Sequence, residues 1–133
     1  MKTWQAETRQ HSRDCKKNDA SAVDINALKI LVGDNPDKHC LLLQKYTESA
    51  VVGIEQIKMA LKNLDANSIR LQSHKLKSSS KSIGADELAC AFQALESVSE
   101  AGLWYEIYLL VSRVHRLYGK VEIYIDNFYS RDI

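Results

Sequence analysis

Apolar residues recur at helical spacing along most of the chain, and the strict alternation typical of strands is absent from the sequence. One stripe alternates steps of three and four: Leu43, Thr47, Ala50, Ile54, Ile57, Leu61 and Leu64. Another stripe follows the same rule nearer the C-terminus: Ile107, Val111, Val114, Tyr118, Val121, Ile125 and Phe128. This spacing places side chains on one face of an α-helix. The pattern therefore predicts an all-α protein.

Residues that favour helix ends divide these patterns into separate elements. Asp24 is suited to cap a short helix, and Gly33 is suited to follow it. The apolar stripe of this helix, which we expect to be buried, is Ile25, Leu28, Leu31 and Val32. Asn35 and Pro36 are suited to begin the next helix as its cap and first residue. Gly84 ends a later helix by the same rule as Gly33.

Four long helices result, at about 36–64, 67–83, 86–101 and 103–129, with short connections between them. Short connections favour antiparallel neighbours. We therefore predict an antiparallel up-down-up-down four-helix bundle with a short extra N-terminal helix. Residues 1–22 are expected to form a flexible tail or linker, and residues 23–133 the helical bundle domain.

Composition limits the classes of function. The 133 residues suit one domain, with 45% hydrophobic and 26% charged residues. A formal net charge of +1 gives no reason to expect nucleic-acid binding. No apolar run approaches the roughly 20 residues that span a bilayer, and the N-terminal stretch lacks the apolar core of a signal peptide. We therefore expect a cytoplasmic protein without a membrane or nucleic-acid partner.

The third predicted helix contains the candidate chemistry. Ile69, Leu76 and Ile83 recur every seven residues and define its buried side, and His74 falls opposite them. The residues that share the face of His74 are cationic or carry a hydroxyl group: Arg70, Lys77, Ser78 and Lys81. An imidazole is a nucleophile near neutral pH, and lysine ammonium groups offset phosphate charge. The face could hold a phosphoryl group, or it could be an ordinary solvated helix face.

The sequence around this histidine resembles the signature of histidine-containing phosphotransfer (HPt) domains. The resemblance lies in His74-Lys75-Leu76-Lys77-Ser78-Ser79-Ser80, followed by Ser82-Ile83-Gly84-Ala85, Leu88 and Leu95-Glu96. It extends over residues 23–129. In the family pattern the histidine is followed by any residue, then by an aliphatic residue, a lysine, a glycine and two small residues. The departure is Ser78, which stands where the family usually has glycine.

The resemblance implies a role in multistep two-component signalling. His74 would accept a phosphoryl group from a receiver-domain aspartate and pass it to another receiver. The partners implied are response-regulator receiver domains and a hybrid sensor histidine kinase. The chain would be a monomeric phosphocarrier without catalytic activity or a cofactor of its own, because the receiver supplies Mg²⁺. The sequence also lacks nucleotide-binding motifs.

Roles follow for the neighbours of His74. Lys77, one turn later, is expected to approach the phosphoryl oxygens, whereas Lys75 points toward a partner or solvent. Glu96 matches the family position whose side chain hydrogen-bonds the other imidazole nitrogen, where it would orient the ring. The alternative for Glu96 is a surface carboxylate beside Glu100.

The serine at position 78, in place of the family glycine, could affect phosphotransfer in two ways. Its hydroxyl could donate to the phosphate, and its added bulk could narrow the set of partners. We expect activity to be retained, with a receiver docking on a mostly apolar patch with a polar rim. The expected contributors are the short first helix, the beginning of the second and the third.

Three alternatives remain. The first is a non-phosphorylatable HPt-like interaction module, which the departure at Ser78 would favour. The second is the dimerisation domain of a histidine kinase, although the sole proline, Pro36, lies far from His74. The third is a metal site at His11 and Cys15 or at His39 and Cys40, although neither arrangement supplies four ligands at zinc spacing. His115 is expected to be a partly buried structural residue.

Overall fold

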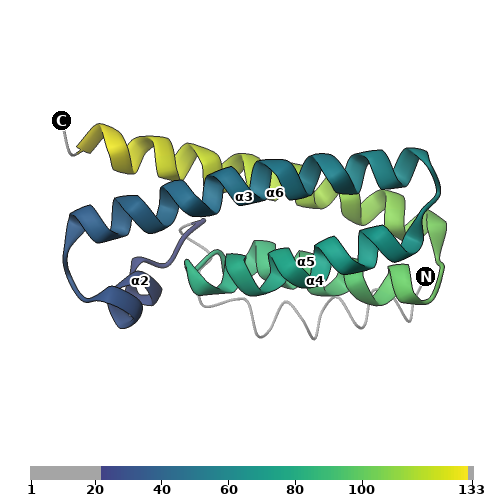
Figure 1. Ribbon diagram of the computed structural model, residues 1–133, viewed down its shortest axis with the longest axis horizontal. Helices are drawn as coiled ribbons and strands as arrows, with labels where there is room; N and C mark the ends of the chain where they lie inside the picture. Colours follow the sequence, from purple (N-terminus) through teal and green to yellow (C-terminus); the bar gives the residue numbers. More distant parts are fainter. Residues whose placement is uncertain (1–21, 132–133) are drawn as a thin grey trace.

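The computed structural model describes residues 22–131, and this part of the chain is helical with no strand. Its elements are α2 (Ile25–Val32), α3 (Pro36–Lys62), α4 (Ala66–Ser82), α5 (Asp86–Glu100) and α6 (Trp104–Arg131). The four long helices run alternately up and down, and α2 lies against one end of them (Figure 1). Helix contacts close a ring, because α3 meets α4, α4 meets α5, α5 meets α6 and α6 returns to α3. The predicted bundle with a short extra N-terminal helix is confirmed.

The core lies along the axis of this ring. The predicted stripe of α4 faces it, since Ile69, Leu76 and Ile83 are at most 4% exposed. Phe92 and Leu95 of α5 are fully buried on the opposite side of the same core. Among the described residues, no helix has the length and apolar character needed to cross a membrane.

Local capping fixes where the helices begin. The Asp24 side chain accepts a hydrogen bond from the backbone N–H of Asn26 (3.0 Å), and Asn35 accepts one from Asp37 (2.9 Å). Pro36 occupies the first turn of α3, as predicted. These contacts satisfy N–H groups that have no partner within their own helix.

Gly84 joins α2 to the turn between α4 and α5. Its φ of +84° is a conformation that side chains with a Cβ rarely adopt, and a Cβ there would collide with the backbone of Asp24. The close approach allows the Asp24 N–H to donate to the Gly84 carbonyl at 2.9 Å. The start of α2 is thereby held beside the end of α4, the helix that contains His74.

A buried hydrogen bond links α3 to α4. The Tyr46 hydroxyl and the Ser80 hydroxyl are 2.8 Å apart, and Ser80 is fully buried. Burial raises the pKa of Tyr46 well above its ordinary value, although the bond to Ser80 partly opposes this. The bond therefore joins α3 to α4 inside the core.

Three details of the sequence interpretation were wrong. Leu64 lies outside α3, because the helix ends at Lys62 and Leu64 adopts a φ of +54° with an exposed side chain. Leu31 is 55% exposed rather than buried, because α2 contacts the bundle through the side that includes Leu28. His115 is exposed because it lies off the buried stripe of α6. Of the predicted tail, residues 1–21 lie outside the described residues.

Candidate functional site

His74 lies in the middle of α4 with its side chain pointing outward. Its side chain is 61% exposed, while Ser73 just before it and Leu76 two residues after it are buried. Because those neighbours fix the rotation of α4, the imidazole is presented on the surface without any break in the helix. The predicted placement of His74 opposite the buried stripe is confirmed.

Glu96 of α5 contacts the imidazole from the side. Its Oε2 atom lies 2.9 Å from Nδ1 of His74. An ionised carboxylate can only accept a hydrogen bond, so Nδ1 carries the proton and donates it. In the neutral ring the other nitrogen, Nε2, then holds the lone pair. None of the described residues hydrogen-bonds to Nε2, so the lone pair on this nitrogen is not engaged within the described part of the chain.

Lys77 contacts the same carboxylate. Its Nζ lies 3.0 Å from Oε1 of Glu96, and both side chains are largely buried, at 26% and 20% exposure. Burial acts to raise the pKa of Glu96, but the hydrogen bonds from Lys77 and His74 outweigh it and hold that pKa below its usual range. The three side chains therefore form one charged network around an ionised Glu96.

The other predicted residues of this face do not join the network. Arg70 donates to Asn67 at 2.9 Å, one turn back along α4. Lys75, Ser78 and Lys81 are exposed. Lys77, expected to approach the phosphoryl oxygens, is instead bound to Glu96 in this structure, so a contact with a phosphoryl group stays a prediction.

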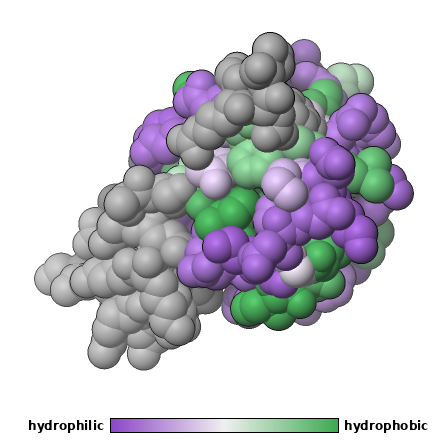
Figure 2. Space-filling view, turned by 90° about the vertical axis from the view of Figure 1, so that its left-hand side faces the viewer, coloured by the Kyte–Doolittle hydropathy of each residue, from purple (hydrophilic) through white to green (hydrophobic). Residues whose placement is uncertain are grey.

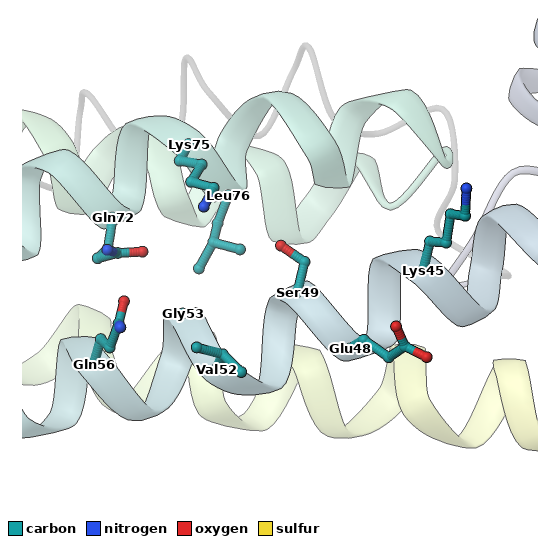
Figure 3. Close-up of a pocket in the computed structure, with 9 residues that line it drawn as sticks. All are labelled: Lys45, Glu48, Ser49, Val52, Gly53, Gln56, Gln72, Lys75 and Leu76. Atoms are coloured by element: carbon teal, nitrogen blue, oxygen red, sulfur yellow. The ribbon is translucent and has the colours of Figure 1, made fainter.

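A groove lies between α3 and α4, and Lys75, which follows His74 in the sequence, is one of its lining residues. Figure 3 shows Gln56 and Gln72 facing each other at one end and Lys45 at the other. In the middle, Leu76 points toward Gly53, where an added Cβ would lie 2.8 Å from its Cδ1 atom. Gly53 thus allows α3 to approach α4 closely at Leu76.

One exposed apolar residue close to His74 in α4 was not named from the sequence. Leu71, three residues before His74, is 52% exposed. The sequence pattern could have identified Leu71, because it is a large apolar residue on the otherwise polar side of α4. Other exposed apolar side chains belong to α2 and α3: Ile30, Leu31, Leu41 and Val52. The end of the molecule that includes α2 shows hydrophobic surface between hydrophilic side chains (Figure 2).

The metal alternative named His39 and Cys40 within the described part of the chain, and the structure shows no cluster of potential ligands around them. Within residues 22–128, no group of three or more potential metal-ligating side chains lies together. His39 is buried, and its Nε2 lies 2.7 Å from the Gly33 carbonyl, to which it donates. It therefore closes the turn between α2 and α3. His11 and Cys15 lie outside the described residues.

Comparisons with known proteins identify the family of this chain. The model of the Hpt domain family matches residues 41–119, which include His74, Lys77 and Glu96. The chain belongs to the Hpt domain family. Its fold is similar to that of histidine-containing phosphotransfer protein B from Pseudomonas aeruginosa, with a TM-score of 0.78 and 24% identity over 84% of this chain and 97% of that one. A search of curated proteins found no match. Family membership supports a phosphotransfer role in two-component signalling.

Proposed function

We propose that this protein is a phosphorelay intermediate that accepts a phosphoryl group on Nε2 of His74 from a receiver-domain aspartate and passes it to another receiver. The observation that supports this most strongly is that one imidazole nitrogen is hydrogen-bonded to Glu96 while most of the side chain is exposed to solvent. Nδ1 is held by Glu96 at 2.9 Å, while the side chain as a whole is 61% exposed. The ring is oriented by one nitrogen and open to a partner at the other.

The transfer step follows from this arrangement. The Nε2 lone pair attacks phosphorus of the aspartyl phosphate, the bond from phosphorus to the aspartate oxygen breaks, and the aspartate leaves as a carboxylate. The phosphorylated ring keeps its proton on Nδ1 and becomes more positive. Glu96 stabilises this charge through the hydrogen bond it already accepts. Onward transfer reverses these events with a second receiver aspartate.

A receiver would dock over α4 and the neighbouring surfaces of α2 and α3. Apolar contacts would come from Leu71 beside His74 and from Val52 at the groove, both more than half exposed. Lys45 and Lys75 line the same groove and would form part of a polar rim. Helix α4 contains four cationic residues and no acidic ones, which favours an acidic partner surface.

The remaining elements of this proposal come from the family resemblance. The chain would transfer phosphate as a carrier, with no cofactor of its own and with Mg²⁺ supplied by the receiver. Receiver domains and a hybrid sensor histidine kinase would be its partners. A monomeric state and a cytoplasmic location stay predictions from the sequence.

The test is transfer from a phosphorylated receiver in the absence of ATP, comparing the wild type with His74→Gln. The proposal predicts acid-labile label on the wild type and none on the variant. His115→Gln is the matched control, because His115 is exposed on α6 and has no role in the proposal. A folded wild type that takes no label from any of several receivers would favour the non-phosphorylatable interaction module.

A further inference from the structure

Four serines near the end of α4, at positions 78, 79, 80 and 82, differ in how their hydroxyl groups are used. Ser79 donates to the Leu76 carbonyl at 3.2 Å, and Ser82 donates to the Ser78 carbonyl at 3.0 Å. Ser80 is bonded to Tyr46. The Ser78 hydroxyl has no hydrogen-bond partner among the described residues and is exposed to solvent. It is thus the one hydroxyl of this group that is free to bind something outside the protein.

Ser78 is also the serine closest to the reactive face. It follows His74 by four residues in an unbroken helix, and residues at this spacing have Cβ atoms about 5–6 Å apart. The cations at similar spacing already have partners, because Lys77 is bound to Glu96 at 3.0 Å and Arg70 to Asn67 at 2.9 Å. A group attached to the exposed Nε2 of His74 would therefore meet a free hydroxyl next to it and a lysine that already has a partner.

We propose that the Ser78 hydroxyl donates a hydrogen bond to the phosphoryl group on His74 and prolongs the lifetime of the phosphohistidine. This rests on the proposed function, because it concerns a phosphoryl group at that site. It goes further by assigning a role to the residue that replaces the usual family glycine, which cannot supply such a donor.

The direction of the effect follows from the chemistry of hydrolysis. Water attacks phosphorus, the bond from phosphorus to Nε2 breaks, and Nε2 retains the electron pair and gains a proton. The transition state is metaphosphate-like and loosely bonded. Because the electrons of the breaking P–N bond withdraw onto the nitrogen, the phosphoryl oxygens carry less negative charge there than in the phosphohistidine. A donor on a phosphoryl oxygen therefore stabilises the phosphohistidine more than its transition state. An exposed hydrogen bond of this kind is expected to change the rate by about threefold.

The test uses phosphoramidate, which loads histidine chemically when its P–N bond is replaced by a bond to Nε2 and ammonia leaves. Wild type, Ser78→Ala and Ser78→Thr are loaded, freed of reagent, and followed by phosphorus NMR. We expect Ser78→Ala to lose its label about threefold faster than the wild type. Ser78→Thr, which keeps the hydroxyl, should remain close to the wild type.

Ser82→Ala is the control, because it removes an exposed hydroxyl that already has a backbone partner. It should leave the lifetime unchanged. Equal lifetimes for Ser78→Ala and the wild type would overturn the inference, as would a failure of phosphoramidate to load His74. If phosphoramidate loads His74 but no receiver does, the relay role fails, and the lifetimes still decide the role of Ser78.

Discussion

The Oε2 atom of Glu96 lies 2.9 Å from Nδ1 of His74 and joins α5 to α4 across 22 residues of sequence. This contact selects the tautomer that leaves Nε2 nucleophilic. Loss of the carboxylate would free the ring to rotate and would remove a negative charge that stabilises the phosphorylated state. The relation between these two residues is the basis of the predictions that concern transfer.

Glu96→Ala should lower the rate of phosphoryl transfer to His74 by about tenfold, as the loss of an orienting carboxylate does elsewhere. Glu96→Gln should lose less, because its amide oxygen can still accept the Nδ1 hydrogen bond. Initial rates of transfer from a phosphorylated receiver provide the measurement. Glu100→Ala, one turn later and exposed, is the matched control. Equal rates for Glu96→Ala and Glu100→Ala would show that Glu96 is only a surface carboxylate.

Lys77→Met should raise the pKa of Glu96 toward its ordinary value. Burial already favours the neutral carboxyl, and the hydrogen bond from Lys77 is the largest influence that lowers the pKa. A side-chain NMR titration of Glu96 in both proteins measures the change. Lys75→Met is the control, since Lys75 is exposed on α4 and makes no contact with Glu96 in the structure. No rise in Lys77→Met would contradict the network.

The lowered pKa of Glu96 also sets the sign of a pH effect on stability. A carboxyl whose folded pKa lies below its unfolded value adds stability that is fully present above the unfolded pKa. That stability is lost as the pH falls through the folded pKa. The difference in unfolding free energy between the wild type and Lys77→Met, expected to be below about 1 kcal/mol, should therefore vanish in acid. A difference that persisted in acid would point to lost packing.

Ser80→Ala should destabilise the bundle by about 1–3 kcal/mol, because it leaves the buried Tyr46 hydroxyl without its partner. Adding Tyr46→Phe should recover part of this loss, since the unsatisfied hydroxyl is then removed. Urea unfolding of both single variants and the double variant measures the coupling. Ser112→Ala, which removes an exposed hydroxyl on α6, should be nearly neutral. Additive effects of the two core substitutions would show that the hydrogen bond contributes nothing.

Two glycines in the middle of long helices should respond differently to alanine. Gly119→Ala should stabilise the protein by about 1 kcal/mol, because alanine favours helix and the added Cβ meets open space. Gly53→Ala should show no such gain, because its Cβ would lie 2.8 Å from a buried Leu76 methyl group. Thermal unfolding compares them directly. A similar gain at both positions would mean that α3 does not need this glycine.

Local features of the fold could be predicted from the sequence because their causes are local. Asp24, Asn35 and Pro36 begin helices through contacts within a few residues. The seven-residue repeat of Ile69 and Leu76 located the buried side of α4 and so the exposed side with His74. A resemblance in sequence added the role of Glu96 as a candidate contact.

Features that depend on packing between helices were missed or misplaced. The bond between Tyr46 and Ser80 joins residues 34 apart, and no local pattern encodes it. The contact between Lys77 and Glu96 was missed, because the distance between these two side chains depends on how α5 lies against α4. Leu31 matched the apolar stripe of α2, but only a tertiary structure shows which part of a short helix faces the bundle.

NMR of the phosphorylated protein would show which nitrogen of His74 is bonded to phosphorus. The wild type would be loaded from a phosphorylated receiver without ATP, and the imidazole nitrogens observed by phosphorus and nitrogen NMR. We expect one phosphoryl group, bonded to Nε2 of His74, with the proton retained on Nδ1. A phosphoryl group on Nδ1, or on another of the four histidines, would contradict it.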